Sequence, residues 1–380
     1  MKTLVVGISV RAMVASAIRS GYPVLALDAF GDQDLKSLAE AYALHRDFNV
    51  RYSPHALYET SRQFSYDAVA YTSNLENYPK IIQHLAGSRK IMGNSPQTVA
   101  AVRRWAELFD RLGRAGFPVP ETIFAEDKRK GDSHRRWLIK PVSGGGGHGV
   151  IFQKRSEFPG TRFMLQEYVS GKACSASFVA NGQDCIVLGI AEQLIGMHPF
   201  GSQGFRYCGN ILPLPEITDP GRAEILVAKV RRLAVFLTHA YGLTGVNGID
   251  FILNGERMYL TEVNPRYSAS MELIEHAYEL PVFHLHAQAV LSGTLPAFQL
   301  EAVLGNRTFF GKAILFAERN AVAPNTKGWL DSGARDIPAP GEKLCKGNPF
   351  CTVLANRSTY DETRAELIQR AALLKEAIYE

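Results

Sequence analysis

The stretch that most constrains the fold of this chain is GIDFILNGERMYLTEVNPR, at residues 248–266. It contains two apolar runs, Ile249–Leu253 and Arg257–Thr261, separated by the pair Asn254-Gly255. An Asn-Gly pair between apolar runs is a strong signal for a β-hairpin, because both residues tolerate the positive φ that a tight turn needs. The stretch therefore predicts two antiparallel strands whose register is set by a turn at Asn254-Gly255.

Four polar side chains give this predicted hairpin a chemical character. Asp250 lies on the first strand, and Glu262, Asn264 and Arg266 lie at the end of the second. Carboxylates, phosphate oxygens and waters are the ligands that Mg²⁺ prefers, and Asn264 adds a neutral oxygen. Arg266 would place a permanent positive charge beside phosphate groups. The pattern favours a divalent-cation site over the alternative, an ordinary charged hairpin on the surface.

A second informative stretch is SGGGGHG, at residues 143–149, between the predicted strands Trp137–Lys140 and Val150–Gln153. Consecutive glycines cost backbone entropy and offer no side chain for packing. Their advantage is that backbone N–H groups can approach a phosphate closely, and such a loop could close over a ligand. A P-loop is not predicted, since the GK[ST] ending is missing and a strand follows. An ordinary surface loop is the alternative.

Together these stretches resemble the ATP-grasp superfamily, whose members end a strand with E-x-N-P-R and carry an acidic residue twelve positions before the Glu. Glu262 and Asp250 have that spacing. The resemblance implies that Asp250, Glu262 and Asn264 hold the metal. It also implies that Lys140 contacts the α- and β-phosphates and that Lys140 and Arg266 act in catalysis. The phosphate flap would be formed by Gly144, Gly145, Gly146 and Gly147.

The same resemblance implies where the rest of the nucleotide binds. Glu167, Tyr168 and Val169, at the end of the predicted strand Phe163–Val169, match the hinge whose backbone pairs with adenine. An Arg or Lys near the start of the helix predicted from Pro96 to Ala115 would reach the α-phosphate. Both Arg103 and Arg104 lie there, and Arg104 is favoured, with an exposed helix arginine as the alternative. The acidic residue that holds the ribose in many relatives has no counterpart near Cys174.

The N-terminus predicts a βαβ unit: a strand at Leu4–Ile8, a helix from Ser9 to Ser20 and a strand at Val24–Leu27. The G-x-G-x-x-G pattern of dinucleotide-binding folds is absent, so NAD is not predicted. Ser9 and Arg11 follow a strand at the edge of a parallel sheet where ligands bind, which makes them candidates for substrate contacts. Helix capping is the alternative for Ser9.

The predicted fold class is α/β and α+β, in three parts. Residues 1–95 would form an N-terminal Rossmann-like domain of the kind that precedes an ATP-grasp fold. Residues 96–300 would form the two-lobed ATP-grasp body, with its glycine-rich flap at 140–150 and its metal hairpin at 248–266. Residues 301–380 would form a small β-rich extension that ends in a helix. This extension resembles that of the biotin-carboxylase branch, and the chain resembles predicted ATP-dependent carboligases of that branch.

Two further segments carry expectations that the structure can test. A long helix is predicted over Thr218–Tyr241, with Asp219 and Gly242 as its start and end signals. Its expected core positions are Ile225, Ala228, Leu233 and Phe236. Residues 198–215, HPFGSQGFRYCGNILPLP, predict an irregular loop near a site. Its residues Arg206, Tyr207 and Asn210 either face the substrate or pack the loop.

Composition excludes several classes of function. The formal net charge of +5 over 380 residues, without a basic cluster interleaved with aromatics, gives no support for nucleic-acid binding. The five cysteines form no CxxC pair and are odd in number, which favours a reducing cytoplasm over a disulfide framework. The apolar start is interrupted by Arg11, so a buried strand explains it better than a signal peptide, and no apolar run is long enough to span a membrane.

The function expected from the resemblance is a cytoplasmic carboxylate–amine ligase that uses ATP and Mg²⁺ (or Mn²⁺). ATP would phosphorylate a carboxylate, and an amine would displace the phosphate to give an amide. The partners would be small-molecule carboxylate and amine substrates, with a homodimer left open. A tyramine–glutamate ligase of cofactor biosynthesis is one specific option. The alternatives are a biotin-carboxylase-like enzyme that uses carboxyphosphate and a regulatory nucleotide-binding protein without turnover.

Overall fold

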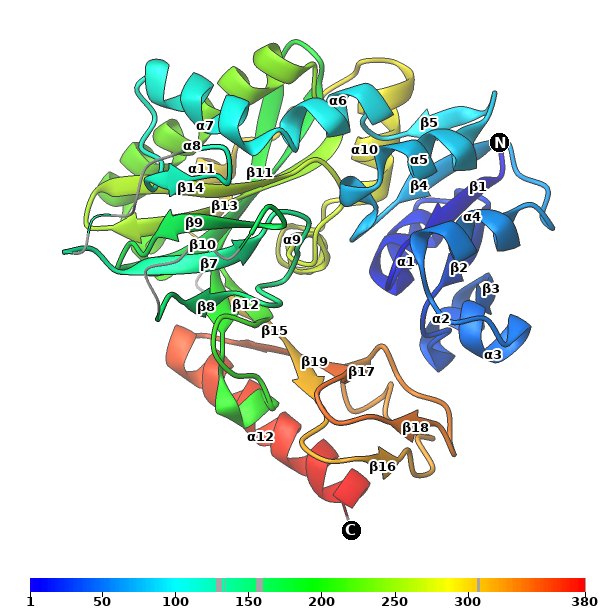
Figure 1. The fold of residues 1–380 in the computed structure, drawn as a ribbon. Helices are drawn as coiled ribbons and strands as arrows, with labels where there is room; N and C mark the ends of the chain where they lie inside the picture. The colour runs from blue at the N-terminus through cyan, green and yellow to red at the C-terminus, as the bar shows by residue number, and fades with distance from the viewer. Residues whose placement is uncertain (128–131, 133, 155–159, 306–307, 380) are drawn as a thin grey trace.

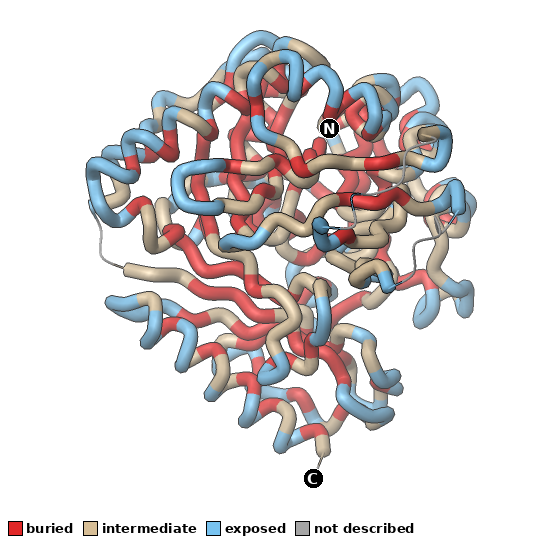
Figure 2. Tube along the Cα trace, turned by 60° about the vertical axis from the view of Figure 1, so that its left-hand side comes forward, coloured by how far each residue is buried: buried red, intermediate tan, exposed pale blue. Residues whose placement is uncertain are grey.

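The structure is a computed structural model of the 380-residue chain, and it describes residues 1–127, 132, 134–154, 160–305 and 308–379. Its strands form three main sheets (Figure 1). Residues of all three sheets line one cavity. In this part of the chain no helix is long and apolar enough to cross a membrane. Buried residues follow the strands and the inward faces of the helices, whereas the outward faces of the helices are exposed (Figure 2).

The N-terminal sheet is parallel, with the strand order β3-β2-β1-β4-β5. Its central strands are continuous apolar runs that are buried on both faces, as expected for a parallel sheet covered by helices. The predicted βαβ start is confirmed. The elements are β1 (Thr3–Val6), α1 (Arg11–Arg19), β2 (Val24–Asp28), α2 (Gln33–Leu38), β3 (Glu40–Ala43), α3 (Leu44–Phe48), α4 (Pro54–Ser61), β4 (Ala68–Tyr71), η1 (Leu75–Asn77), α5 (Pro79–Ala86) and β5 (Lys90–Met92).

The helix predicted from Pro96 to Ala115 is two helices, which corrects the expectation of a continuous one. α6 (Pro96–Val102) is capped by the Ser95 hydroxyl, and α7 (Trp105–Arg114) follows after a break at Arg103-Arg104. The break turns Trp105 inward: its indole donates a hydrogen bond to the Val142 carbonyl. It also lets the two adjacent arginines point in different directions, which decides which of them reaches the central cavity.

The flap sheet follows, with the order β6-β9-β7-β8. It presents the glycine-rich loop between β7 and β8, as the sequence predicts, with antiparallel pairing between those two strands. Lys140 lies near the end of β7, directly before the loop. The strands are β6 (Thr122–Ile123), β7 (Trp137–Pro141), β8 (Ile151–Phe152) and β9 (Phe163–Glu167).

The large sheet is antiparallel, with the order β14-β13-β10-β11-β12-β15-β19-β17. Residues 207–212, which the sequence analysis left in an irregular loop, form one of its inner strands and pair with strands on both sides. The strands up to the hairpin are β10 (Lys172–Asn181), β11 (Cys185–Ile195), β12 (Tyr207–Leu212), β13 (Thr244–Asn254) and β14 (Arg257–Asn264), with η2 (His198–Phe200) and η3 (Pro215–Thr218) between them.

Helices cover both faces of the large sheet. On one face, α7 and α8 (Pro220–Tyr241) pack on β10, β13 and β14 (Figure 1). On the other, α9 (Met271–Tyr278) and α10 (Val282–Leu291) fill the space between this sheet and α1 of the N-terminal sheet. The core stripe of α8 differs from the prediction. Ile225 and Ala228 are exposed and Phe236 is half-buried; the buried residues are Ala223, Leu226, Val227, Val230, Leu233, Ala234, Leu237 and Thr238.

The C-terminal segment is β-rich and ends in a helix, as expected, but its long strands belong to the large sheet rather than to a separate one. β15 (Phe309–Phe316) pairs with β12, and β19 (Pro349–Arg357) pairs with β15. The terminal helix α12 (Tyr360–Tyr379) packs along β15 and β19, and Glu380, the last residue expected in it, lies outside the described residues. The remaining elements are α11 (Leu300–Val303), β16 (Ala321–Val322), β17 (Ala334–Arg335) and β18 (Lys343–Leu344).

Candidate active site

A cavity of about 1180 Å³ lies where the three sheets meet. The N-terminal sheet, the flap sheet and the large sheet all contribute to its wall, and so does the C-terminal segment around residues 336–352. Nearly all the residues predicted from the sequence to bind nucleotide or metal line this one space. They are Lys140, Gly144, Gly145, Gly146, Gly147, Glu167, Tyr168, Val169, Asp250, Glu262, Asn264 and Arg266.

The register of the β13–β14 hairpin brings its two carboxylates face to face. Asn254 pairs with Arg257, so the turn consists of Gly255-Glu256 and lies one residue later than predicted. That pairing alone would place Thr261 opposite Asp250. A register shift between Asp250 and Phe251 instead pairs Asp250 directly with Glu262. Such a bulge inserts one extra residue into a strand and redirects the side chains beyond it.

The carboxylate of Asp250 is held by neutral amides. The Asn264 side chain donates a hydrogen bond to its Oδ2 at 3.0 Å, and the Gln193 side chain donates to its Oδ1 at 2.9 Å. Burial, followed by the charge of Glu262, raises the pKa of Asp250 to about 7. Two adjacent carboxylates make an environment that a divalent cation would stabilise.

These carboxylates fit a cation that also takes ligands from a bound molecule. Within the described ranges, no group of three or more His, Cys, Asp and Glu side chains is arranged to hold a metal ion. Asp250 and Glu262 offer two facing carboxylates, and the Asn264 side chain lies beside them as a neutral group. This donor set matches a hard cation such as Mg²⁺, which is commonly bound by one or two carboxylates and completed by phosphate oxygens and water.

Arg266 is fixed beside the carboxylate pair by a buried partner from the N-terminal sheet. Its Nη2 lies 2.7 Å from Oε1 of Glu76, a fully buried residue in η1, and donates to Oδ1 of Asn264 at 3.1 Å. Burial opposes the charge of Arg266, but the combined attraction of Glu76, Glu262 and Asp250 raises the pKa of the guanidinium. Its Nε is buried without a hydrogen-bond partner in the described structure, so it can still donate to a ligand.

Lys140 lies where a positive charge can meet an anionic ligand. Its Nζ donates to the Oε1 of Gln166 at 2.9 Å, across the neighbouring strand β9. Burial lowers the pKa of Lys140, while Glu262 and Asp250 act in the opposite direction. A buried ammonium with a single neutral acceptor retains two donor hydrogens for a ligand.

The glycine-rich loop is held over the cavity by its backbone. The Tyr207 N–H donates to the Gly146 carbonyl at 3.0 Å, and the Asn77 side chain approaches the Gly144 carbonyl. Gly147 has a φ of +71° and passes so close to the Phe205 carbonyl that a Cβ at this position would lie 1.8 Å from its oxygen. Gly147 is therefore required by close backbone approach, which a sequence of four glycines signals only in general terms.

The segment Glu167–Val169 leaves one backbone donor available. The Glu167 N–H donates to the Glu121 carbonyl and the Tyr168 N–H to the Arg136 carbonyl, both at 2.8 Å. Among the described residues, no acceptor is found for the N–H of Val169. The Glu167 side chain points toward Arg135, with 3.1 Å between Oε2 and Nη1. Val169 and the buried Met164 both line the cavity.

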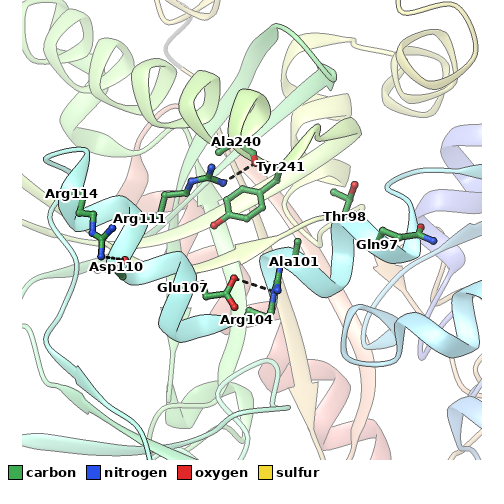
Figure 3. A pocket seen from close by; sticks show the side chains of 10 residues that line it. All are labelled: Gln97, Thr98, Ala101, Arg104, Glu107, Asp110, Arg111, Arg114, Ala240 and Tyr241. Atoms are coloured by element: carbon green, nitrogen blue, oxygen red, sulfur yellow. Dashed lines mark hydrogen bonds and ion pairs between the residues drawn. The ribbon is translucent and has the colours of Figure 1, made fainter.

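The structure favours the other arginine of the pair at the helix break. Arg103 lines the cavity, its Nη1 lies 2.9 Å from Oε1 of Glu262, and its side chain is 9% exposed. Arg104, favoured by the sequence analysis, is 62% exposed and pairs with Glu107. Figure 3 shows Arg104 in a different pocket on the outer surface, near Tyr241. Arg104 is corrected to a surface position because the break between α6 and α7 turns it away from the cavity.

Other residues join the cavity through contacts that sequence spacing does not reveal. Tyr207 and Asn210, left undecided between substrate contact and packing, both line it and hydrogen-bond to each other. Arg206 instead donates to the Gly347 carbonyl. Gln166 and Glu76 were not singled out by the sequence, because Gln166 ends an apolar run and Glu76 stands in a short polar turn, and neither pattern marks a site. Cys174 is buried, and burial raises the pKa of its thiol, as expected for a packed residue.

An acidic hairpin, a glycine-rich loop with a preceding lysine, and a cavity between them are the features on which the sequence analysis based its resemblance to the ATP-grasp superfamily. Residues 105–270 match the family model described as an ATP-grasp domain. Over residues 105–270 the chain is therefore similar to the ATP-grasp superfamily, and it shares its fold with a biotin carboxylase domain.

Similar proteins include both relatives by sequence and solved structures. An uncharacterised protein of Methanocaldococcus jannaschii is 24% identical over 379 residues, which cover 94% of this chain and 89% of that protein. The large chain of carbamoyl phosphate synthase from Mycobacterium tuberculosis is 25% identical over 62% of this chain, but this chain spans only 22% of its length.

Two solved structures show the same fold over nearly the whole chain. The biotin carboxylase domain of Hydrogenobacter thermophilus 2-oxoglutarate carboxylase, in complex with MgADP and bicarbonate, superimposes with a TM-score of 0.72 at 15% identity, covering 99% of this chain and 90% of that one. The L-amino acid ligase of Bacillus licheniformis superimposes with a TM-score of 0.68 at 16% identity, covering 100% and 98%.

Proposed function

We propose that this chain is a carboxylate–amine ligase: ATP phosphorylates a substrate carboxylate, and an amine then displaces the phosphate to give an amide and ADP. The observation that carries this proposal is the convergence of Asp250, Glu262, Arg266 and Lys140 on one cavity beneath the glycine-rich loop. The similar structures that bind MgADP or ligate amino acids support the same class of reaction.

Asp250, Glu262 and Asn264 would hold Mg²⁺, because they supply the hard oxygen ligands on facing strands. When bound, the metal would supply neutralisation of the β- and γ-phosphates of ATP. Gln193 positions Asp250 by donating a hydrogen bond to the Oδ1 of the aspartate. Arg103 positions Glu262 in the same way, through its Oε1.

The remaining cations of the cavity would bind the transferring phosphoryl group. Lys140 has two donor hydrogens left and Arg266 has a free Nε, so each can donate to phosphate oxygens without losing its present partner. In a buried site, a fixed donor aimed at a developing negative charge stabilises the transition state by roughly 3–4 kcal/mol. The chain therefore contributes mainly by positioning and charge, as phosphoryl transfer requires.

The proposal does not identify the two substrates, and the cavity is large enough for both beside a nucleotide. Glutamate with tyramine is the first pair to test. Carboxylation through carboxyphosphate is the second candidate, because the biotin carboxylase domain that superimposes on this chain was crystallised with bicarbonate.

The test is a screen for ADP release by the full chain with ATP and Mg²⁺, using pairs of carboxylates and amines with and without bicarbonate. An amide ligase should release ADP only when both organic substrates are present, and the product mass should equal the sum of the two minus water. Release that requires bicarbonate and no amine would contradict the proposal in favour of carboxylation.

Glu262→Gln is the matched variant for this screen. It keeps the size of the side chain but removes one of the two facing charges, so ADP formation should fall by at least about a hundredfold, a cost of about 3 kcal/mol. ADP binding measured by calorimetry should persist, because the Val169 backbone and the apolar wall do not depend on the metal. Turnover near that of the wild type would mean that the hairpin does not hold the catalytic metal.

A further inference from the structure

A cluster of acidic residues lies beside the cavity, where the chain after β2 meets the C-terminal segment, and two of its acids, Asp32 and Asp336, line the cavity. Its members come from three distant parts of the chain and are more numerous than the cations among them. The acids are Asp28, Asp32, Asp34, Glu272 and Asp336, and the cations are Arg11 and Lys312.

Every acid of this cluster except Asp32 is engaged in holding the fold. Asp28 accepts hydrogen bonds from the backbone of Phe30 and Gly31 at 3.0 and 2.8 Å. Asp34 accepts from the Ile337 and Asp336 N–H groups and thereby ties α2 to the C-terminal segment.

The two cations are engaged in the same way. Arg11 lies 2.8 Å from Asp336 and 2.5 Å from Glu272, and Lys312 lies 2.6 Å from Glu272. Arg11, a candidate substrate contact in the sequence analysis, is therefore a fully buried structural residue. The charge of Arg11 acts on Asp32, but among the described residues neither cation forms an ion pair with it.

Asp32 stands where an aspartate normally caps a helix, yet its side chain makes no cap hydrogen bond to α2. It is 6% exposed, it lines the cavity, and its Oδ2 is buried without a hydrogen-bond partner among the residues described. An unpaired buried carboxylate is costly, and side chains of this kind are kept when a ligand satisfies them. Burial, followed by the negative charge of Asp336, raises the pKa of Asp32 well above its ordinary value.

We propose that Asp32 binds the ammonium group of a substrate, so that one substrate of the ligase is an amine or amino acid that carries a protonated nitrogen. The excess of acids over cations around Asp32 favours a positively charged ligand. A divalent metal is disfavoured because the neighbouring carboxylates are already occupied. An ammonium ion needs only one free carboxylate and neutral acceptors, and Ser9 is one of the polar residues that line the same cavity.

That the ligand is a substrate rests on the proposed function. The test of the Asp32 site measures binding and needs no turnover. The protein saturated with MgADP is titrated with the twenty common L-amino acids and tyramine, each compared with its N-acetyl derivative, in which the acetylated nitrogen carries no charge. We expect at least one ammonium-bearing compound to raise the melting temperature of the wild type, and its N-acetyl derivative to have no effect.

Asp32→Asn should lower the affinity for that compound by at least about tenfold, as expected for loss of a charge-assisted hydrogen bond. The affinity for ADP should stay unchanged. The variant should fold at least as stably as the wild type, because the carboxylate it replaces has no partner. Glu342→Gln is the matched control. It lies in the same cavity, but its carboxylate already accepts from the Ala339 N–H at 3.0 Å, so binding should change less than about twofold, within the range of a surface substitution.

Equal binding by Asp32→Asn and the wild type would overturn the assignment, as would equal binding of the acetylated compounds or no binding by any ammonium-bearing compound. An equal loss in Glu342→Gln would attribute the effect to the general charge of the cavity and would also contradict it. If a compound binds through Asp32 but never supports ADP release, the assignment of Asp32 as a cation site holds, and only the amide-ligase proposal is contradicted.

Discussion

Protonation of His286 should destabilise the protein in mild acid. His286 lies on α10 and is 2% exposed. The Val246 N–H of β13 donates to its Nδ1 at 2.9 Å, so Nδ1 is an acceptor and Nε2 carries the proton that faces the Met92 carbonyl of β5 at 3.0 Å. A second proton on Nδ1 would point at the Val246 N–H and would break this link between the N-terminal sheet and the large sheet.

The size of the effect follows from the pKa of His286, which burial lowers from 6.5 to about 4. Because the folded pKa is depressed, the unfolded chain binds the proton first, and stability is fully present above the unfolded value and is lost as the pH falls toward 4. Each pH unit corresponds to about 1.4 kcal/mol, so the complete loss is about 3 kcal/mol and the loss at about pH 5 is about 2 kcal/mol.

The assay compares urea unfolding at about pH 7.5 and about pH 5 for the wild type and for His286→Gln, whose side chain does not titrate. The variant will be less stable at both pH values, but its stability should fall by about 2 kcal/mol less between them. His198→Gln, at an exposed position, is the matched control and should follow the wild type. A pH dependence identical in His286→Gln and the wild type would refute the reasoning, as would an NMR titration of His286 with its midpoint near 6.5.

The other predictions concern the nucleotide. Lys140→Ala should weaken ATP binding by roughly tenfold or more without unfolding the protein, because a charge-assisted hydrogen bond contributes about 1.5–3 kcal/mol. Calorimetry measures the affinity and circular dichroism checks the fold. An unchanged affinity would mean that Lys140 does not contact the phosphates. Arg103→Ala should reduce MgATP binding because its side chain contacts Glu262 and lines the cavity, whereas Arg104→Ala, its exposed neighbour, should not. Calorimetry on the two variants decides between them, and the reverse order of affinities would restore the assignment made from the sequence.

Local patterns in the sequence predicted the elements that depend on neighbouring residues. The apolar run of β1, the Asp219 cap and Gly242 end of α8, and the strands on both sides of the glycine-rich loop are all found. Their signals lie within one turn or one strand, where backbone conformation follows directly from the residues present.

Patterns failed where partners distant in the sequence decided the outcome. The sequence showed the helical spacing of apolar residues in α8, but which face of the helix is buried depends on the strands it packs against. Ile225 was therefore placed in the core, although it is 52% exposed. β12 was missed because its glycine and polar residues resemble a loop, and only pairing with β11 and β15 makes it a strand. Backbone pairing of this kind overrides intrinsic propensity.

The residue types and spacing of the hairpin were determined by the sequence alone: an acid, a second acid twelve positions later, and the E-x-N-x-R ending. Tertiary structure decided that Glu262 rather than Thr261 faces Asp250, that Arg103 rather than Arg104 enters the cavity, and that Asp32 remains without a partner. The physical reason is that strand register, helix breaks and the pairing of buried charges are fixed by contacts between segments far apart in the chain, which no local pattern encodes.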